Sequence, residues 1–231
     1  MGFIDLSGSL GRHFGSIGVA LNEINTTLSL SYSEQLSFSG IDSERARSCV
    51  KRLCVALNVS DKLHFQLDAC IPEHVGLGSG TQMAIAIGMA LSAFYDLGLS
   101  VRDIACVAER GARSGIGIAI FEQGGLIVDG GRGEQTQTPP VISRMPVPDD
   151  WRFILVFDKR GQGLHGNDEV QAFKELPPFP QQEAARLCYL LMMQGLPALA
   201  EQNIALFGDA ITQLQRSVGE HFSAAQGGIF T

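Results

Sequence analysis

The sequence predicts an α+β protein in two parts, residues 1–150 and residues 151–231. Segments with strand periodicity and segments with helical periodicity mix along the first part. The pattern then shifts across a linker region near residues 140–152, and from residue 167 onward it is helical. This order of elements is typical of the α+β class. The second part is expected to be an incomplete unit.

The first strands are predicted from the alternation of apolar and polar residues, and the first helix from its N-cap. Strands are predicted over residues 3–6, 17–21, 26–32 and 62–70. The last of these is the clearest, because Leu63, Phe65 and Leu67 alternate with polar residues. Asp42 or Ser43 is predicted to cap a helix that runs to about Leu57.

A helix over residues 81–97 is apolar nearly all round, which places it at the centre of the fold. A capping box, Ser100 with Asp103, opens a second helix. Strands at 118–122 and 126–129 flank two glycines, which predicts a hairpin. In the second part, residues 152–158 read as a buried strand. The helices that follow are expected to break at 177–178 and at 195–197.

Composition excludes several classes of protein. Lys and Arg number 17 against 24 Asp and Glu, a net charge of −7, which argues against broad binding to nucleic acid or to anionic membranes. The longest apolar run, 83–91, is far shorter than the ~20 residues of a membrane span. Five cysteines without a Cys-x-x-Cys pair predict reduced thiols and no zinc framework. Met1 is followed by no signal-peptide pattern, so a cytoplasmic location is expected.

A glycine-rich loop over residues 76–81 follows the strand at 62–70 and precedes the apolar helix. Strand, glycine loop and helix form an arrangement that cradles phosphate, because backbone N–H groups point inward at a helix N-terminus. No lysine is present for a Walker loop, and Thr81 stands where the dinucleotide fingerprint needs glycine. His74 lies just before the loop. The alternative is a simple turn that leads into a core helix.

Three further loops carry groups suited to chemistry. Residues 110–117 place two arginines beside small residues, which suits oxyanion binding or a helix cap with solvated arginines. Asp5 and Arg12 flank a glycine and serine turn, and either converge on one ligand or form a surface ion pair. His165, in the glycine-rich segment 161–166, is a proton donor or acceptor, or an ordinary loop residue.

The segment Pro72-x-x-x-Gly76-Leu77-Gly78-Ser79-Gly80-Thr81 resembles the second motif of the GHMP kinase superfamily, Pro-x-x-x-Gly-Leu-Gly-Ser-Ser-Ala. Four stretches resemble more narrowly the β-ribofuranosylaminobenzene 5′-phosphate synthases, a branch whose members are not kinases. They are residues 4–12, 74–82, 114–131 and 161–169. Family members are longer at both ends, so this chain looks trimmed at each terminus.

The resemblance implies a GHMP-type N-terminal domain, like domain 2 of ribosomal protein S5, followed by an incomplete ferredoxin-like unit. It implies condensation of phosphoribosyl pyrophosphate with 4-hydroxybenzoate or 4-aminobenzoate, with loss of CO₂ and pyrophosphate, in tetrahydromethanopterin biosynthesis. Mg²⁺ and a homodimer are also implied. The alternatives are an ATP-dependent small-molecule kinase and a non-catalytic remnant.

The resemblance also implies the site residues. Asp5 and Arg12 would be catalytic, with Asp5 a ligand of Mg²⁺ and Arg12 a contact for a carboxylate or a phosphate, while His165 would contact substrate. The implied phosphate-binding residues are His74, Gly76, Leu77, Gly78, Ser79, Gly80, Thr81, Arg113, Ser114, Gly115 and Gly117.

Overall fold

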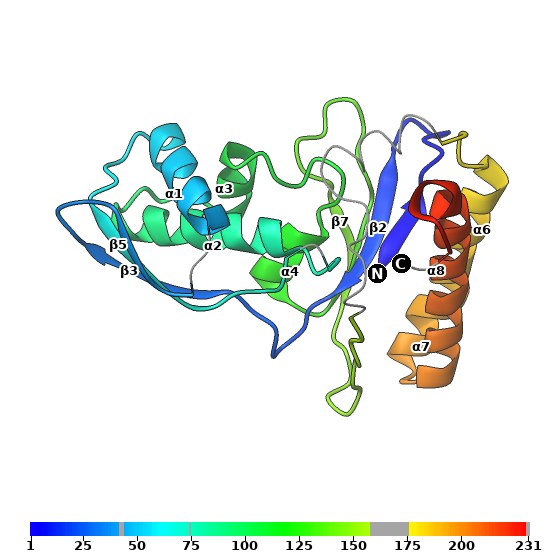
Figure 1. The fold of residues 1–231 in the computed structure, drawn as a ribbon. Helices are drawn as coiled ribbons and strands as arrows, with labels where there is room; N and C mark the ends of the chain where they lie inside the picture. Colours follow the sequence, from blue (N-terminus) through cyan, green and yellow to red (C-terminus); the bar gives the residue numbers. More distant parts are fainter. Residues whose placement is uncertain (42–43, 74, 158–175, 230–231) are drawn as a thin grey trace. The chain divides into compact units, whose positions relative to one another are not determined.

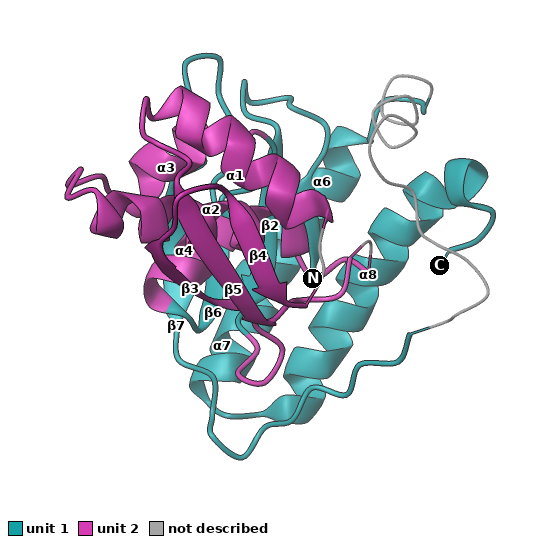
Figure 2. Cartoon of the chain, turned by 60° about the vertical axis from the view of Figure 1, so that its left-hand side comes forward, with its two compact units in different colours: residues 1–20, 113–116, 124–231 teal, residues 21–112, 117–123 magenta. Residues whose placement is uncertain are grey.

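The computed structural model describes residues 1–41, 44–73, 75–157 and 176–229. The chain forms two compact units (Figures 1 and 2). Unit 1 comprises residues 1–20, 113–116 and 124–231, and unit 2 comprises residues 21–112 and 117–123. The chain therefore passes between the units several times, whereas the sequence predicted a single boundary at residue 150. That boundary stays a prediction.

Unit 2 contains a three-stranded sheet covered by helices. The strand order is β3 (Thr27–Tyr32), β5 (Leu63–Ala69), β4 (Ser37–Gly40), with β3 antiparallel and β4 parallel to β5. Its helices are α1 (Glu44–Ala56), α2 (Ser79–Phe94), α3 (Val101–Val107) and most of α4 (Ile116–Gln123). The α+β class is thus confirmed in this unit.

The core of unit 2 follows from the predicted periodicities. Leu63, Phe65 and Leu67 of β5 are all buried, as their alternation predicted. They pack against buried side chains of α1 and α2, including Leu53 and Ile87. On another side of α2, buried apolar residues of α3 and α4 meet Ile85. Helix α2 is therefore enclosed, which explains why its sequence is apolar nearly all round.

Unit 1 pairs an antiparallel sheet with helices. The strand order is β1 (Gly2–Asp5), β2 (Phe14–Val19), β6 (Leu126–Asp129), β7 (Val141–Met145). Helix α6 (Gln181–Leu190), a π-helical turn η1 (Leu191–Gly195), α7 (Leu196–Ala200) and α8 (Ile204–Gln226) follow. Buried side chains of the strands and helices, among them Ile17, Leu126, Leu187 and Leu214, form one apolar cluster.

Two predicted strands are wrong. Residues 118–122 lie in helix α4, and Gly124 and Gly125, with φ of 62° and 82°, end that helix instead of forming a hairpin turn. Left-handed glycines serve both purposes, so the dipeptide alone does not decide between them. Residues 152–157 form no strand, and Ile154 and Val156 are 87% and 88% exposed.

The predicted helix break at residues 195–197 is also wrong. The chain stays helical from α6 through η1 into α7, with Pro197 in the first turn of α7. Proline lacks an N–H, and the wider π-helical turn before it accommodates that loss. Past β7, the described part of the chain contains helices and no strands. The ferredoxin-like assignment of the C-terminal part therefore stays a prediction.

Among the described helices, none combines the length and the apolar content that crossing a bilayer requires. The five cysteines are present as free thiols.

Candidate functional site

The glycine loop lies in unit 2, where α2 begins. Gly76 and Gly78 have φ of 75° and 68°, and Gly78 is the N-cap of α2. A methyl group added to either glycine would meet nothing within 4 Å, so the space beside the loop is open. The first N–H groups of a helix have no partner within it, and α2 offers those of Ser79 and Gly80 here. The loop therefore has the room and the donors of an anion cradle.

Gly117 is packed against the start of α2. Gln82 Nε2 donates a hydrogen bond of 2.6 Å to the carbonyl of Gly117, and a methyl group on Gly117 would lie 2.9 Å from Thr81 Cγ2. Within unit 2, the predicted phosphate-binding residues of the glycine loop therefore lie close to Gly117, which carries the same prediction. The close approach requires glycine at position 117.

A pocket borders the same end of α2. Its volume is about 280 Å³, close to the lower end of the roughly 300–1,000 Å³ of small-molecule sites. We call it the arginine pocket, after three of the residues that line it. The lining residues are Glu44, Arg45, Ser48, Cys49, Arg52, Gly80, Met83 and Arg110.

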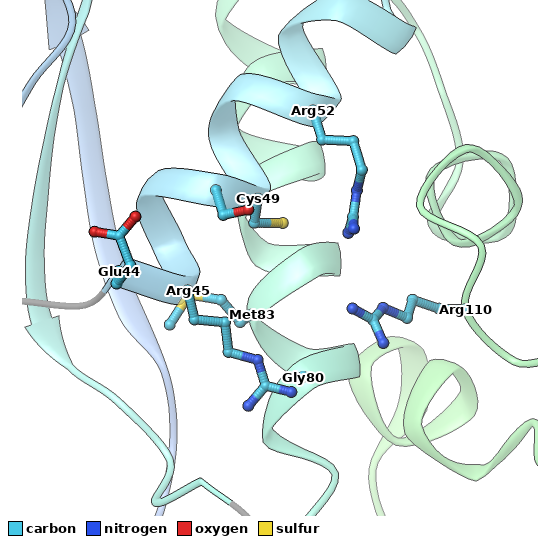
Figure 3. A pocket seen from close by; sticks show the side chains of 8 residues that line it. Glu44, Arg45, Cys49, Arg52, Gly80, Met83 and Arg110 are labelled. Atoms are coloured by element: carbon cyan, nitrogen blue, oxygen red, sulfur yellow. The ribbon is translucent and has the colours of Figure 1, made fainter. Parts of the chain in front are cut away.

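The three arginines reach the arginine pocket from two parts of unit 2 (Figure 3). Arg45 and Arg52 stand on one face of α1, and Arg110 follows α3. Glu109, with φ of 54°, ends α3, and the amide of Arg110 returns a 2.8 Å hydrogen bond to Ala105. This capping arrangement fixes the point from which the Arg110 side chain leaves the backbone.

Arg45 joins the arginine pocket to the glycine loop. Its Nη1 donates to Ser79 Oγ at 3.2 Å and lies 3.7 Å from a carboxylate oxygen of Glu73. A methyl group added to Gly80 would stand 2.1 Å from Arg45 Nη2. Gly80, where the superfamily motif has serine, therefore provides the space that the Arg45 guanidinium occupies.

Charge in the arginine pocket is unbalanced. Burial, and then the neighbouring charges of Arg52 and Arg45, lower the pKa of Arg110. Burial raises the pKa of the Cys49 thiol, and the three arginines oppose that rise. Burial is the first cause of both pKa shifts, and the further effects of the arginine charges show that these cations lie close together in a partly dry space.

Asp5 and Arg12 lie in unit 1 and do not form an ion pair with each other. Asp5 Oδ1 accepts hydrogen bonds from the amide and the hydroxyl of Ser7, at 2.8 and 2.7 Å. Arg12 donates from Nε to the carbonyl of Gly130 and from Nη2 to that of Gly131, each at 2.8 Å. Of the five N–H donors of its guanidinium, three are left over from these bonds.

Ser114 and Gly115, also in unit 1, lie at a buried carboxylate that the sequence did not single out. Asp129, with no exposed surface, accepts from the amide of Gly115 at 2.9 Å and from Ser114 Oγ at 3.2 Å. Any phosphate contact of these two groups would compete with Asp129. Arg113 is half-buried in the same unit. His74 and His165 lie outside the described residues.

Mg²⁺ was expected at Asp5. In the described part of the chain, no cluster of three or more His, Cys, Asp or Glu side chains is suited to a metal ion. Mg²⁺ is nevertheless often held by one or two carboxylates together with substrate phosphates. The hydrogen bonds described above engage Asp5 Oδ1, so Oδ2 is the oxygen that would serve as a ligand.

Comparisons with known proteins identify relatives of the chain and of its fold. Residues 44–125 match the model of the GHMP kinases N terminal domain. The chain is 31% identical to β-ribofuranosylphenol 5′-phosphate synthase of Methanothermobacter thermautotrophicus and 34% identical to that of Archaeoglobus fulgidus. Each match covers 92% of this chain and 71% of the relative.

Among solved structures, phosphomevalonate kinase of Streptococcus pneumoniae superposes with a TM-score of 0.59. It has 11% identity, and the match covers 94% of this chain and 75% of that one. Mevalonate kinase of L. major gives a TM-score of 0.57 at 16% identity, over 89% and 69% of the two chains. These likenesses confirm the predicted fold.

Proposed function

Because the chain belongs to the family of β-ribofuranosylphenol 5′-phosphate synthases, we propose that it condenses phosphoribosyl pyrophosphate with 4-hydroxybenzoate. The relatives' name specifies a phenol, which 4-hydroxybenzoate yields and 4-aminobenzoate does not. The observation that carries the proposal is the glycine loop, whose open space lies at the N-terminus of a sixteen-residue helix. That is the arrangement that a pyrophosphate leaving group needs.

The reaction balances without an oxidant or a reductant. The bond between ribose C1 and the pyrophosphate oxygen breaks, and its electron pair leaves with pyrophosphate. The ring carbon that bears the carboxylate, para to the hydroxyl, forms the new bond to C1. The bond to the carboxylate then breaks, CO₂ departs, and its electron pair restores the aromatic ring.

The glycine loop supports departure of the leaving group. In this proposal the amides of Ser79 and Gly80 donate to the pyrophosphate, and the N-terminus of α2 adds its partial positive charge. The exposed Gly76 and Gly78 let the backbone approach the phosphates, because neither carries a Cβ. Donors fixed in place before the reaction stabilise the charge that develops on the leaving group.

Asp5 and Arg12 are proposed to act on the charged parts of the substrates. Arg12 would use its remaining donors for a carboxylate or a phosphate, since arginine binds both in bidentate fashion. Asp5 would hold Mg²⁺ through Oδ2 together with substrate oxygens. When bound, Mg²⁺ neutralises part of the pyrophosphate charge. The proposal also includes four residues that the resemblance implies as phosphate-binding: Arg113, Ser114, Gly115 and Gly117.

A homodimer and a cytoplasmic location remain part of the proposal. The resemblance implies the dimer, and apolar side chains of the last helices are candidates for its contact surface. Leu187, Leu191 and Leu199 are buried within unit 1, whereas Ile204 and Leu206 are 55% and 47% exposed. The latter would form part of the dimer contact, and sedimentation as a monodisperse monomer would count against it.

The decisive experiment follows CO₂ from carboxyl-labelled 4-hydroxybenzoate with phosphoribosyl pyrophosphate and no ATP. Labelled CO₂ and pyrophosphate in equal amounts would support the proposal. Phosphate transfer from ATP to a small alcohol, without CO₂ release, would favour the kinase alternative, whose fold is the same. Absence of both activities in folded protein would favour a non-catalytic binding role.

A further inference from the structure

We propose that Arg45, Arg52 and Arg110 bind the 5′-phosphate of phosphoribosyl pyrophosphate in the arginine pocket, beside the pyrophosphate in the glycine loop. The inference rests on the proposed function for the identity of the ligand. The proposal requires that the arginine pocket recognise a phosphate monoester. The resemblance implies no role for these three arginines, and of the three the sequence motifs include only Arg110, in the loop 110–117.

Three arginine side chains converge on the arginine pocket. Arg45 and Arg52 lie about two turns apart on α1 and share a face with Ser48, and Arg110 comes from the end of α3. In Figure 3 the guanidinium groups of Arg52 and Arg110 extend into the space between α1 and the segment that carries Arg110, and that of Arg45 extends toward Gly80. Because like charges disfavour one another, such a cluster of arginines is suited to an anionic ligand that compensates them.

The described residues around the arginine pocket supply little negative charge to balance the three arginines. Among the described lining residues, Glu44 alone is acidic, and it is exposed. Glu73 lies 3.7 Å from Arg45, but both side chains are partly exposed, so the pair contributes little. Arg110 Nε is buried and has no hydrogen-bond partner within the described residues. A buried donor of this kind is normally satisfied, and a phosphate oxygen would satisfy it.

The arginine pocket is continuous with the glycine loop. Gly80 lines the pocket and belongs to the loop, and the Arg45 guanidinium lies against it while bonding Ser79. A ligand with two anionic groups can therefore reach both sites. Phosphoribosyl pyrophosphate carries two such groups, one on each side of its ribose.

Calorimetry with two separate probes tests the assignment. Ribose 5-phosphate reports on the arginine pocket, and inorganic pyrophosphate reports on the glycine loop. The variants are Arg52→Gln and Arg110→Gln, with Lys51→Gln as the control. Lys51 is an exposed cation of the same helix that does not line the pocket, so its removal changes net charge equally.

Each arginine variant should weaken ribose 5-phosphate binding by about tenfold or more, the loss expected for one charge-assisted contact. Pyrophosphate affinity should change by less than about threefold, and Lys51→Gln should change neither. Unaltered ribose 5-phosphate affinity in both arginine variants would overturn the proposal. An equal loss in Lys51→Gln would also overturn it, because the effect would then be general electrostatics.

Thermal unfolding separates binding from folding. Arg52 is exposed, so Arg52→Gln should keep the melting temperature of the parent chain and stays informative if Arg110→Gln unfolds. Failure of the proposed reaction would leave the ribose 5-phosphate results intact while no CO₂ is released. Failure of the pocket assignment would leave CO₂ release intact while both arginine variants bind ribose 5-phosphate normally.

Discussion

The carboxylate of Asp129 accepts a hydrogen bond from the backbone amide of Gly115, with 2.9 Å between Oδ2 and the nitrogen. The same carboxylate accepts from the hydroxyls of Ser16 and Ser114 and from the amide of Gly131. It thereby joins β2, the end of β6 and the segment that leads into α4 within unit 1. A single fully buried acid determines the course of three chain segments.

Asp129→Asn should destabilise the chain by on the order of 3 kcal/mol. An amide NH₂ would replace one acceptor oxygen and face N–H and O–H donors, which would lose their partner while buried. Urea unfolding measures the change. Asp68→Asn, an exposed acid of β5, is the control and should stay within about 0.5 kcal/mol. Equal stability of the two variants would show that the buried carboxylate is dispensable.

Gly78→Val should reduce the affinity for inorganic pyrophosphate by about tenfold or more. The β-branched side chain would occupy the open space above the loop and would resist a positive φ. Gly98→Val is the matched control, because Gly98 has φ of 66° against 68° and the same open surroundings. Both variants should lose a similar 1–2 kcal/mol or so of stability from backbone strain. An equal loss of pyrophosphate affinity in Gly78→Val and Gly98→Val would show that the glycine loop has only a structural role.

Arg12→Ala should lower turnover about 30- to 1000-fold, the loss expected when a charge-assisted contact with a substrate anion disappears. The structure adds a cost of about 1 kcal/mol in stability, because two hydrogen bonds to the carbonyls of Gly130 and Gly131 are lost. Rates of CO₂ release and urea midpoints measure the two effects. Arg12→Lys keeps the charge without the guanidinium fork. Full turnover in Arg12→Ala would remove Arg12 from the site.

Folding stability should fall as the pH rises from about 9 to 11, in part through Cys54. Burial, and then Asp61, raise the pKa of Cys54 to about 11 from an ordinary value near 9. The thiol of the unfolded chain therefore ionises first, and the stabilisation present below pH 9 is lost as the pH approaches the folded value. Cys54→Ala should flatten this dependence, whereas Cys106→Ser, at an exposed position, should not. Urea unfolding at several pH values compares the slopes.

Local periodicity was enough for the elements that build the core of unit 2. The alternation over residues 62–70 and the all-round apolar character of residues 81–97 correctly predicted β5 and α2. Helix α4 was missed because a short apolar run fits either period, and the two glycines after it suit a helix end as well as a turn. Strand β4 has one large apolar residue, Phe38, and its pairing with β5 depends on distant sequence.

The glycine loop was found from its motif, but the arginine pocket was not. Arg45 and Arg52 read as part of the solvated face of a helix, and only the packing of α1 against α2 brings them to Gly80. Their spacing on one face together with Ser48 was the available signal. The sequence did not indicate the role of Asp129 either. An acidic residue at the end of a strand is ordinarily expected to be exposed, and only the fold shows the donors that surround its carboxylate.

The strand order of unit 1 has a consequence for synthesis on the ribosome. Ser16 of β2 and Asp129 of β6 pair in the sheet although they lie 113 residues apart in the chain. At about 5–20 residues per second, β2 emerges roughly 6–23 s before its partner. Until then β1 and β2 form at most an isolated hairpin, which is marginally stable in water. The sheet of unit 2, complete within residues 27–69, can close in that interval. A ribosome stalled before residue 126 would therefore expose β2 without its partner strand β6, in a chain whose unit 2 sheet has already formed.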